Sequence, residues 1–238
     1  MGLERTKTGI AGLDSILEGG FPKSSSVLIS GGSGTGKTIM CTQYLYNGAK
    51  DYNEPGVYVT LENNVKNITW NMESFNWDIK KFQDQNLIKI YRFNVRNVTT
   101  GPSVDSRMRL ELEHISKLVE EIGAKRLVVD STTSLGLWLS GGSLRLMLYE
   151  FTDALMDLGC TTLLTTETKD KRNQFSAFGV EEFISDGIIA LYFTPPNRSI
   201  FIRKMRGTDH SKSIHPLTIN KNGITVNSKE QILWESLE

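Results

Sequence analysis

The chain has 238 residues, with 27 basic and 27 acidic side chains and a hydrophobic fraction of 39%. This length suits one large α/β domain over residues 1–238, with a buried core, and is short for two domains. The formal charge of zero excludes a generally basic nucleic-acid-binding protein, so any such contact would need a local basic patch.

Apolar segments of strand length alternate with helical periods along most of the chain. Strands are predicted at residues 27–30, 57–61, 87–91, 127–130 and 161–165. Helices are predicted at residues 36–50, 63–75, 115–122 and 144–158. This alternation predicts an α/β fold with a mainly parallel central sheet and helices on both faces.

Beyond about residue 187, short strands separated by turn residues replace this alternation. We expect strands at residues 188–193, 199–205, 217–219 and 224–226. Pro195-Pro196-Asn197 and residues 220–223 predict hairpin turns. The simplest arrangement is a C-terminal β-meander added to one edge of the sheet.

The cysteines and the apolar segments define the expected compartment. Cys41 and Cys160 lie in apolar sequence and form neither a disulfide framework nor a metal-ligand set, which indicates small core residues of a reduced protein. The N-terminal residues MGLERTKTGIAG lack the apolar segment of a signal peptide. No run approaches about 18 apolar residues, so we expect a cytoplasmic protein without a membrane partner.

One glycine-rich segment matches the P-loop pattern G-x-x-x-x-G-K-[ST], with Gly31, Gly32, Ser33, Gly34, Thr35, Gly36, Lys37 and Thr38. It follows a predicted strand and opens a predicted helix, as the motif requires. The glycines expose backbone N–H groups to one anion, and the helix N-terminus adds its positive dipole end. We expect Lys37 to reach the β- and γ-phosphates of ATP and Thr38 to ligate Mg²⁺. A chance glycine-rich turn would not account for the lysine, the threonine and both flanking elements.

Two acidic residues end other predicted strands. Asp130 ends LVVD, and because the carboxyl ends of parallel strands form the ligand edge, we expect it to lie beside the Mg²⁺ as a Walker B aspartate. The alternative is a cap on the following segment. Glu62 ends VYVTLE on the same edge, where its carboxylate could polarise the attacking water. It could equally be a solvated residue opening the next helix, and spacing alone leaves both interpretations open.

At these residues the chain resembles the KaiC-like branch of the RecA/RadA ATPases over nearly its whole length. The segment RTKTGIAGLDSILEGGFP, residues 5–22, is similar to the opening of that family. The Glu-Glu pair of the family falls on Glu62 and Asn63. The resemblance implies a RecA-like P-loop fold, ATP and Mg²⁺ as cofactors, and Glu62 as the catalytic base. Because Asn63 replaces the second glutamate, we expect slow hydrolysis.

The segment KMRGTDH, residues 204–210, resembles the K-M-R-G-x-x-H of KaiC-like proteins. There the lysine and arginine reach across a subunit interface to the γ-phosphate held by the neighbour. The resemblance therefore implies catalytic roles for Lys204 and Arg206, and a homo-oligomeric ring, a hexamer, with active sites at the interfaces.

The residue types suit this role. Two residues apart in a strand, Lys204 and Arg206 should share one face, opposite to Phe201, Arg203 and Met205. Two unpaired cations are costly to bury, so something anionic should meet them. The alternative is a solvated edge whose basic residues discourage aggregation.

The chain also departs from the circadian clock protein, which has two such domains in tandem. The phosphorylated Ser-Thr pair of that protein falls near Glu182-Phe183, which cannot accept phosphate. The chain looks more like the stand-alone, single-domain KaiC-like proteins common in archaea.

The segment TKDKRNQFSAFG, residues 168–179, mixes cations and aromatics where RecA-type proteins place a loop facing the ring centre. Lys169, Lys171, Arg172 and Phe175 would suit single-stranded DNA, through phosphate neutralisation and base stacking. The alternative is a solvated loop whose phenylalanines pack on the core or on the adjoining subunit.

Three hypotheses for the ATP cycle follow. The first is a signalling or regulatory ring in which nucleotide state sets oligomer shape and the choice of a protein partner. The second is a RadA-paralog-like, single-stranded-DNA-binding ATPase of DNA repair. The third is a kinase that phosphorylates itself or a partner. A further alternative is that ATP only holds the ring together, with negligible turnover.

Overall fold

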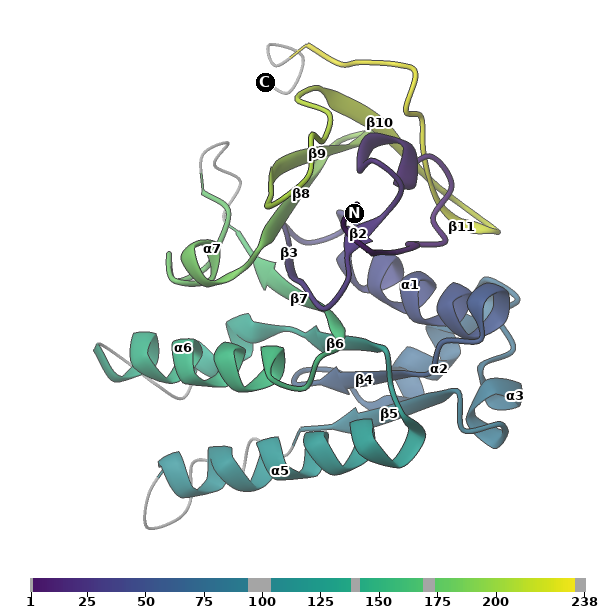
Figure 1. Cartoon of the computed structure of the whole chain (residues 1–238). Helices are drawn as coiled ribbons and strands as arrows, with labels where there is room; N and C mark the ends of the chain where they lie inside the picture. Colours follow the sequence, from purple (N-terminus) through teal and green to yellow (C-terminus); the bar gives the residue numbers. More distant parts are fainter. Residues whose placement is uncertain (1, 94–103, 138–141, 169–173, 234–238) are drawn as a thin grey trace.

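The computed structural model describes residues 2–93, 104–137, 142–168 and 174–233 (Figure 1). The helices are α1 (Lys37–Tyr52), α2 (Val65–Ser74), α3 (Ile79–Asp84), α5 (Val104–Ile122), α6 (Gly142–Met156) and α7 (Glu181–Ile184), with short 3-10 helices η1 (Asp14–Ile16) and η2 (Thr132–Leu137). The strands are β1 (Arg5–Thr6), β2 (Phe21–Pro22), β3 (Ser26–Gly31), β4 (Gly56–Thr60), β5 (Ile88–Arg92), β6 (Arg126–Asp130), β7 (Thr161–Glu167), β8 (Gly187–Thr194), β9 (Asn197–Met205), β10 (Ile214–Asn220) and β11 (Gly223–Val226).

The large sheet has the strand order β11-β10-β9-β8-β3-β7-β6-β4-β5. All neighbours from β8 to β5 are parallel, whereas β8, β9, β10 and β11 pair antiparallel in sequence. β3, β4 and β6 are buried along their whole length, as expected of parallel strands covered on both faces. Below, the edge where the parallel strands end is called the carboxyl edge, and the edge where they begin is called the amino edge.

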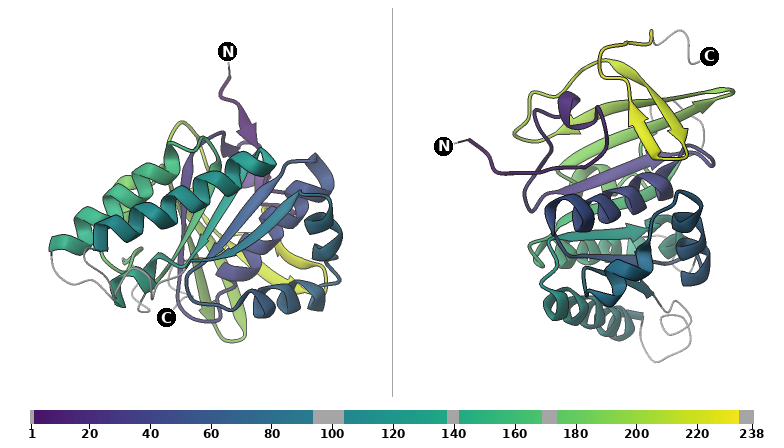
Figure 2. Two further views of the ribbon diagram at one scale, coloured as in Figure 1. Left: turned by 90° about the horizontal axis from the view of Figure 1, so that it is seen from below. Right: turned by 90° about the vertical axis from the view of Figure 1, so that its right-hand side faces the viewer.

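Helices cover both faces of the sheet (Figure 2). On one face, α1, α2 and α3 pack against the sheet in a core that includes Cys41. On the other face, α5 and α6 lie side by side over a second core that includes Cys160. Both cysteines are buried, as predicted for small core residues.

The predicted α/β fold with a mainly parallel sheet and a C-terminal meander is confirmed, with one refinement. The first meander strand, β8, pairs parallel with β3, so it also extends the parallel sheet. The helix α3 and the small β1–β2 sheet were not predicted, because α3 spans six residues and each of these strands spans two. No helix within the described ranges is long and apolar enough to cross a membrane.

A buried arginine ties the N-terminal segment to the sheet. Arg126, at the start of β6, is fully buried and lies 2.6 Å from Oε2 of Glu54. Its guanidinium also donates to the carbonyl oxygens of Tyr44 and Lys7, each at 2.8 Å. The charge is therefore paired and hydrogen-bonded, which a buried ion requires. The N-terminal segment is thereby fixed on the strand whose other end carries Asp130.

Candidate functional site

Four parallel strands bring candidate site residues together at the carboxyl edge. The P-loop follows β3, Glu62 follows β4, Asp130 ends β6 and Glu167 ends β7. These residues line one cavity of about 580 Å³, together with Arg198 and Ile219 from the meander. The carboxyl edge is where open α/β sheets bind ligands, so this cavity is the candidate functional site.

The P-loop takes a backbone conformation that its glycines permit. Gly34 has a φ of 77° and Gly36 a φ of 104°, both in the left-handed region that other residues adopt at a cost. A Cβ atom on Gly36 would also lie 2.9 Å from Cδ1 of Ile219. Because α1 begins immediately after Gly36, the free N–H groups of its first turn face the cavity.

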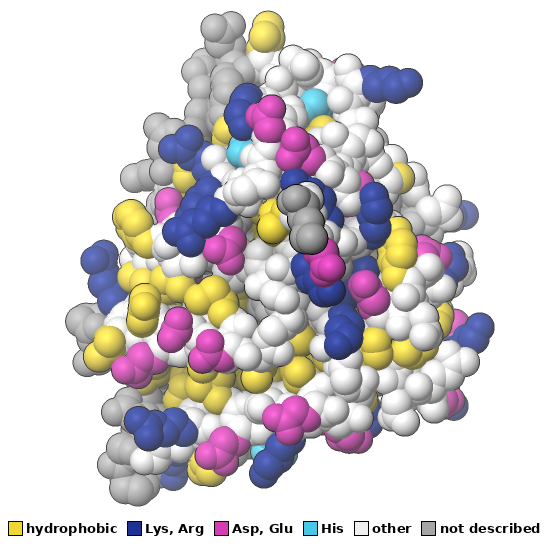
Figure 3. Space-filling model, in the orientation of Figure 1, with side chains coloured by type: hydrophobic (Ala, Val, Ile, Leu, Met, Phe, Trp, Pro, Cys, Tyr) yellow, Lys and Arg dark blue, Asp and Glu magenta, His cyan; other side chains and the backbone are white. Residues whose placement is uncertain are grey.

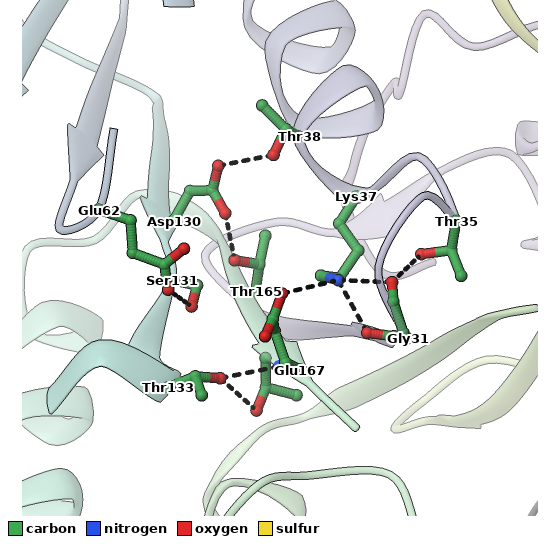
Figure 4. A network of polar contacts seen from close by, with 12 residues as sticks. Gly31, Thr35, Lys37, Thr38, Glu62, Asp130, Ser131, Thr133, Thr165 and Glu167 are labelled. Atoms are coloured by element: carbon green, nitrogen blue, oxygen red, sulfur yellow. Dashed lines mark hydrogen bonds and ion pairs between the residues drawn. The ribbon is translucent and has the colours of Figure 1, made fainter. Parts of the chain in front are cut away.

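Lys37 lies inside the loop, with its ammonium at the cavity (Figure 4). Its Nζ donates to the carbonyl oxygens of Gly31 at 2.8 Å and Gly32 at 2.9 Å, and lies 3.9 Å from Oε1 of Glu167. Burial lowers the pKa of Lys37, and the carboxylates of Glu167, Asp130 and Glu62 act in the opposite direction. The lysine is therefore held in place by the loop itself.

Asp130 is buried and accepts three hydroxyl hydrogen bonds. Thr38 Oγ1 donates to Oδ2 at 2.9 Å, Tyr58 donates to the same oxygen at 2.5 Å, and Thr165 donates to Oδ1 at 2.6 Å. Burial, and then the charge of Asp130, raise the pKa of Tyr58 well above its usual value, so the phenol remains the donor. These bonds hold the carboxylate beside the Thr38 hydroxyl.

Replacing Tyr58 with phenylalanine should lower the free energy of unfolding by about 1.5–3 kcal/mol, because a buried carboxylate loses one of its three donors. Urea denaturation would measure this change. Ser116→Ala is the control, since the Ser116 hydroxyl donates at 3.2 Å to Oε1 of Glu120 at an exposed position where water can replace it. Equal losses in the two variants would contradict a special role of burial at Asp130.

Glu62 lies two residues beyond the end of β4, with its carboxylate fixed at the cavity. Oε1 accepts hydrogen bonds from Ser131 Oγ at 2.6 Å and from Ser134 Oγ at 2.5 Å. The side chain is otherwise exposed, so the carboxylate is both oriented and accessible to water. Asn63 also lines the cavity, and its N–H donates to Thr60 Oγ1 at 2.9 Å.

Two charged residues of the cavity were missed by the sequence interpretation. Glu167 is a strand-end carboxylate like Asp130, so the same rule could have found it; its N–H donates to Thr133 Oγ1 at 2.8 Å. Arg198 donates to the Gly34 carbonyl at 3.0 Å and lies 4.1 Å from the ring centroid of Phe193. No local pattern marks Arg198, because the antiparallel return of β9 brings it to the P-loop.

Lys204 and Arg206 lie at the amino edge, away from the P-loop of their own chain. Gly31 pairs with Leu191 of β8, whereas Val27, four residues earlier in β3, pairs with Gly187. Gly187 in turn pairs with Met205 of β9. The two cations are thus roughly 13 Å from the P-loop end of β3 along the strand direction.

Backbone and acidic groups contact these two cations. Lys204 Nζ donates to the Ser185 carbonyl at 2.6 Å and to the Glu182 carbonyl at 3.2 Å. Burial and the neighbouring Arg206 lower the pKa of Lys204. Arg206 Nη1 lies 3.1 Å from Oδ1 of Asp186, but 60% of its side chain remains exposed.

The predicted alternation of side chains between the two faces of β9 is wrong at the C-terminal end of the strand. The pairing of Ile188 with Lys204 and of Ile189 with Ile202 leaves Arg203 as an extra, bulged residue. Phe201 and Met205 therefore pack into the cores on opposite faces of the sheet, whereas a regular strand would have placed them on one face. Arg206 follows the last residue of the strand.

For the segment after β7, Lys169, Lys171 and Arg172 lie outside the described residues. Phe175 is buried, its N–H donates to Glu182 Oε1 at 3.3 Å, and the guanidinium of Arg203 lies 5.5 Å from its ring centroid. This favours the core-packing alternative over base stacking for Phe175.

Basic and acidic side chains are interspersed on the face seen in Figure 3.

Comparison with known proteins shows the family of this chain. The model of the KaiC ATPase family matches residues 6–231. The chain belongs to the KaiC ATPase family. The resemblance inferred from the P-loop and the KMRGTDH segment is therefore confirmed, and the fold is that of a P-loop ATPase of the KaiC type.

Relatives of the KaiC family match over most of the chain. A UPF0273 protein of Methanocaldococcus jannaschii is 37% identical over 94% of this chain and 96% of its own length. The circadian clock oscillator protein KaiC of Synechococcus elongatus is 35% identical over 94% of this chain but only 44% of its own length. The chain therefore spans less than half of that clock protein.

The solved structure of a KaiC-like protein from Pyrococcus horikoshii is also similar. It is 40% identical in sequence, superimposes with a TM-score of 0.83, and the match covers 94% of this chain and 99% of that protein. The KaiC-like arrangement of the sheet and helices is thus shared with an archaeal protein of similar extent.

Proposed function

We propose that the chain binds ATP with Mg²⁺ in the carboxyl-edge cavity and hydrolyses it at the interface between two copies. The observation that supports this is the separation of the candidate site residues between two edges of one sheet. Lys37, Thr38, Glu62 and Asp130 surround the cavity, whereas Lys204 and Arg206 lie at the amino edge. A second copy would have to supply the missing cations.

Phosphate binding follows from the P-loop geometry. The N–H groups from Ser33 to Thr38 and the Lys37 ammonium would hold the triphosphate. Arg198 and Ile219 line the same cavity, and Arg198 is already oriented by its hydrogen bond to Gly34. The meander therefore contacts the P-loop beside the cavity.

The donor set near the P-loop suits Mg²⁺. Thr38 and Asp130 offer a hydroxyl and a carboxylate 2.9 Å apart, and hard oxygen ligands are those that Mg²⁺ prefers. The described residues contain no cluster of three or more His, Cys, Asp or Glu side chains able to hold a metal. A site made of one hydroxyl and one carboxylate is typical of Mg²⁺ that arrives with a nucleotide and keeps waters and phosphate oxygens as ligands. When bound, the ion would neutralise charge on the phosphate oxygens.

Glu62 is the proposed general base. Its carboxylate is exposed at the cavity and is oriented by two serine hydroxyls, so it can accept the proton of an attacking water. Ser131 and Ser134 both donate to Oε1 and thus leave acceptor capacity on the carboxylate. Asn63 offers no second carboxylate, which is consistent with slow turnover.

Lys204 and Arg206 of a neighbouring copy are proposed to stabilise the charge that develops on the γ-phosphate. The edge that receives these cations and the edge that donates them are different surfaces. Contacts between unlike surfaces are head-to-tail. They form a closed ring when the rotation from each copy to the next adds up to one full turn. We propose a hexameric ring in the cytoplasm that acts in regulation, with nucleotide state setting its shape.

Mixing two inactive variants tests this arrangement. Glu62→Gln lacks the base, and Lys204→Ala lacks the donated cation, but each retains what the other has lost. In a ring mixed at equal amounts, one interface in four pairs an intact base with an intact donor, so activity should recover to about a quarter of the wild-type rate. Steady-state phosphate release measures it. No recovery in a ring shown by native mass spectrometry to be mixed would contradict donation between copies.

A further inference from the structure

The segment after β9, residues 206–211, is fixed in place by Asp186 and by the N-terminal part of the chain; we call it the donor segment. At its two ends, the N–H of Arg206 donates to the Asp186 carbonyl and the N–H of Ser211 to the Ile16 carbonyl, each at 3.0 Å. In between, the N–H of Asp209 donates to Glu18 Oε2 at 2.9 Å. This segment carries Arg206, whose side chain has the Asp186 ion pair and is otherwise mostly exposed.

Arg5 is the main side-chain contact to the middle of the donor segment. Its guanidinium is mostly buried, with 16% of the side chain exposed. It lies within hydrogen-bond distance of five acceptors, namely Thr208 Oγ1 at 2.9 Å, Glu18 Oε2 at 2.9 Å, and the carbonyl oxygens of Gly20 at 3.1 Å, Leu17 at 3.3 Å and Gly207 at 3.5 Å. A planar fork of donors is suited to joining two backbone segments in this way, and a lysine is not.

Glu18 completes the connection. One of its carboxylate oxygens, Oε2, accepts both the Arg5 guanidinium and the Asp209 N–H. Its backbone φ is 52°, in the left-handed region that a non-glycine residue adopts only at a cost in free energy. Such conformations persist where the surroundings enforce them, and they cluster at functional sites.

We propose that Arg5 and Glu18 are positioning residues for the cations donated to the neighbouring copy. By fixing Gly207, Thr208 and Asp209, they hold the backbone on the C-terminal side of Lys204 and Arg206 in one place. An exposed arginine needs such support, because small displacements of a charge at a reacting phosphate reduce the rate strongly. The proposal rests on the proposed function, since it assigns Arg5 and Glu18 to the donating side of the interface.

Mixing Arg5→Met with variants of either side of the interface separates this role from a general structural one. Arg5→Met should lower ATP turnover by about tenfold to a hundredfold without loss of nucleotide affinity. Mixed with Glu62→Gln, it should recover activity, because the defects lie on opposite sides of the interface. Mixed with Lys204→Ala, it should not recover, because both defects lie on the donating side. Glu18→Gln, which keeps an acceptor for Asp209 but loses the charge that faces Arg5, should fall into the same group with a smaller loss.

Lys23→Met is the matched control, because Lys23 forms an exposed ion pair with Glu4 in the same N-terminal segment at 2.6 Å. It should leave turnover unchanged. The assignment requires first that Lys204→Ala and Glu62→Gln restore ATP turnover when mixed with each other. Given that, it would be overturned if Arg5→Met recovered turnover with Lys204→Ala, or if it failed to recover turnover with Glu62→Gln. If that pair fails, donation between copies is wrong and the positioning role falls with it. If Arg5→Met does not fold, Arg5→Lys and Glu18→Gln give the same test.

Discussion

Glu62→Gln is expected to lower the rate of ATP hydrolysis by about 10²–10⁴-fold while leaving ATP affinity nearly unchanged. The amide has the shape of the carboxylate and can still accept hydrogen bonds from Ser131 and Ser134, so its position should be retained. It cannot accept the proton of the attacking water. Single-turnover hydrolysis and equilibrium binding of ATP would measure the two effects separately.

Glu167→Gln is the control for this prediction. Its carboxylate faces the same cavity and lies 3.9 Å from Lys37 Nζ, but its side chain is half exposed, and within the described part of the chain no serine hydroxyl donates to it. We therefore expect a smaller effect on turnover. If Glu167→Gln lost more activity than Glu62→Gln, the base would be Glu167.

Lys204→Ala and Arg206→Ala are each expected to lower turnover by about 10³–10⁵-fold, the largest effects predicted for this chain. A cation placed against the γ-phosphate acts mainly in the transition state, where charge moves onto the phosphate oxygens. Because both residues lie at the amino edge, the P-loop of the same copy should still bind ATP. ATP turnover should therefore fall. The dissociation constant for ATP, measured on dilute, unassembled protein, should stay the same as that of the wild type.

Arg203→Ala is the matched control for these two variants. Arg203 is an exposed cation beside Lys204, but the β-bulge directs it to the ring of Phe175. Its removal should change turnover little. Loss of ATP binding in unassembled Lys204→Ala would contradict donation and indicate a structural role, for example in holding α7 through the carbonyls of Glu182 and Ser185.

The sequence predicted those parts of the fold and site that depend on local patterns. The alternation of buried strands and periodic helices indicated the parallel sheet, and the P-loop marked its carboxyl edge. Once that edge was known, Asp130 and Glu62 could be placed on it, because each follows an apolar strand. Glu167 follows the same rule and could have been included.

Other features depend on contacts between distant segments and left no local signal. Arg198 reaches the P-loop only because β9 returns antiparallel to β8. The bulge at Arg203 depends on how β9 pairs with its neighbour, and simple alternation cannot reveal it. The role of Arg5 depends on a turn more than 200 residues away along the chain, as its contact with Thr208 shows.

The placement of receiving and donating groups at opposite edges of one sheet has a genetic consequence. Each copy in a ring would take part in two sites, as the holder of one nucleotide and as the donor to the next. A copy inert in both roles would silence two sites, so activity would fall with the square of the intact fraction. Alleles inert in both roles, expressed beside the intact one, would then lower activity below the intact fraction.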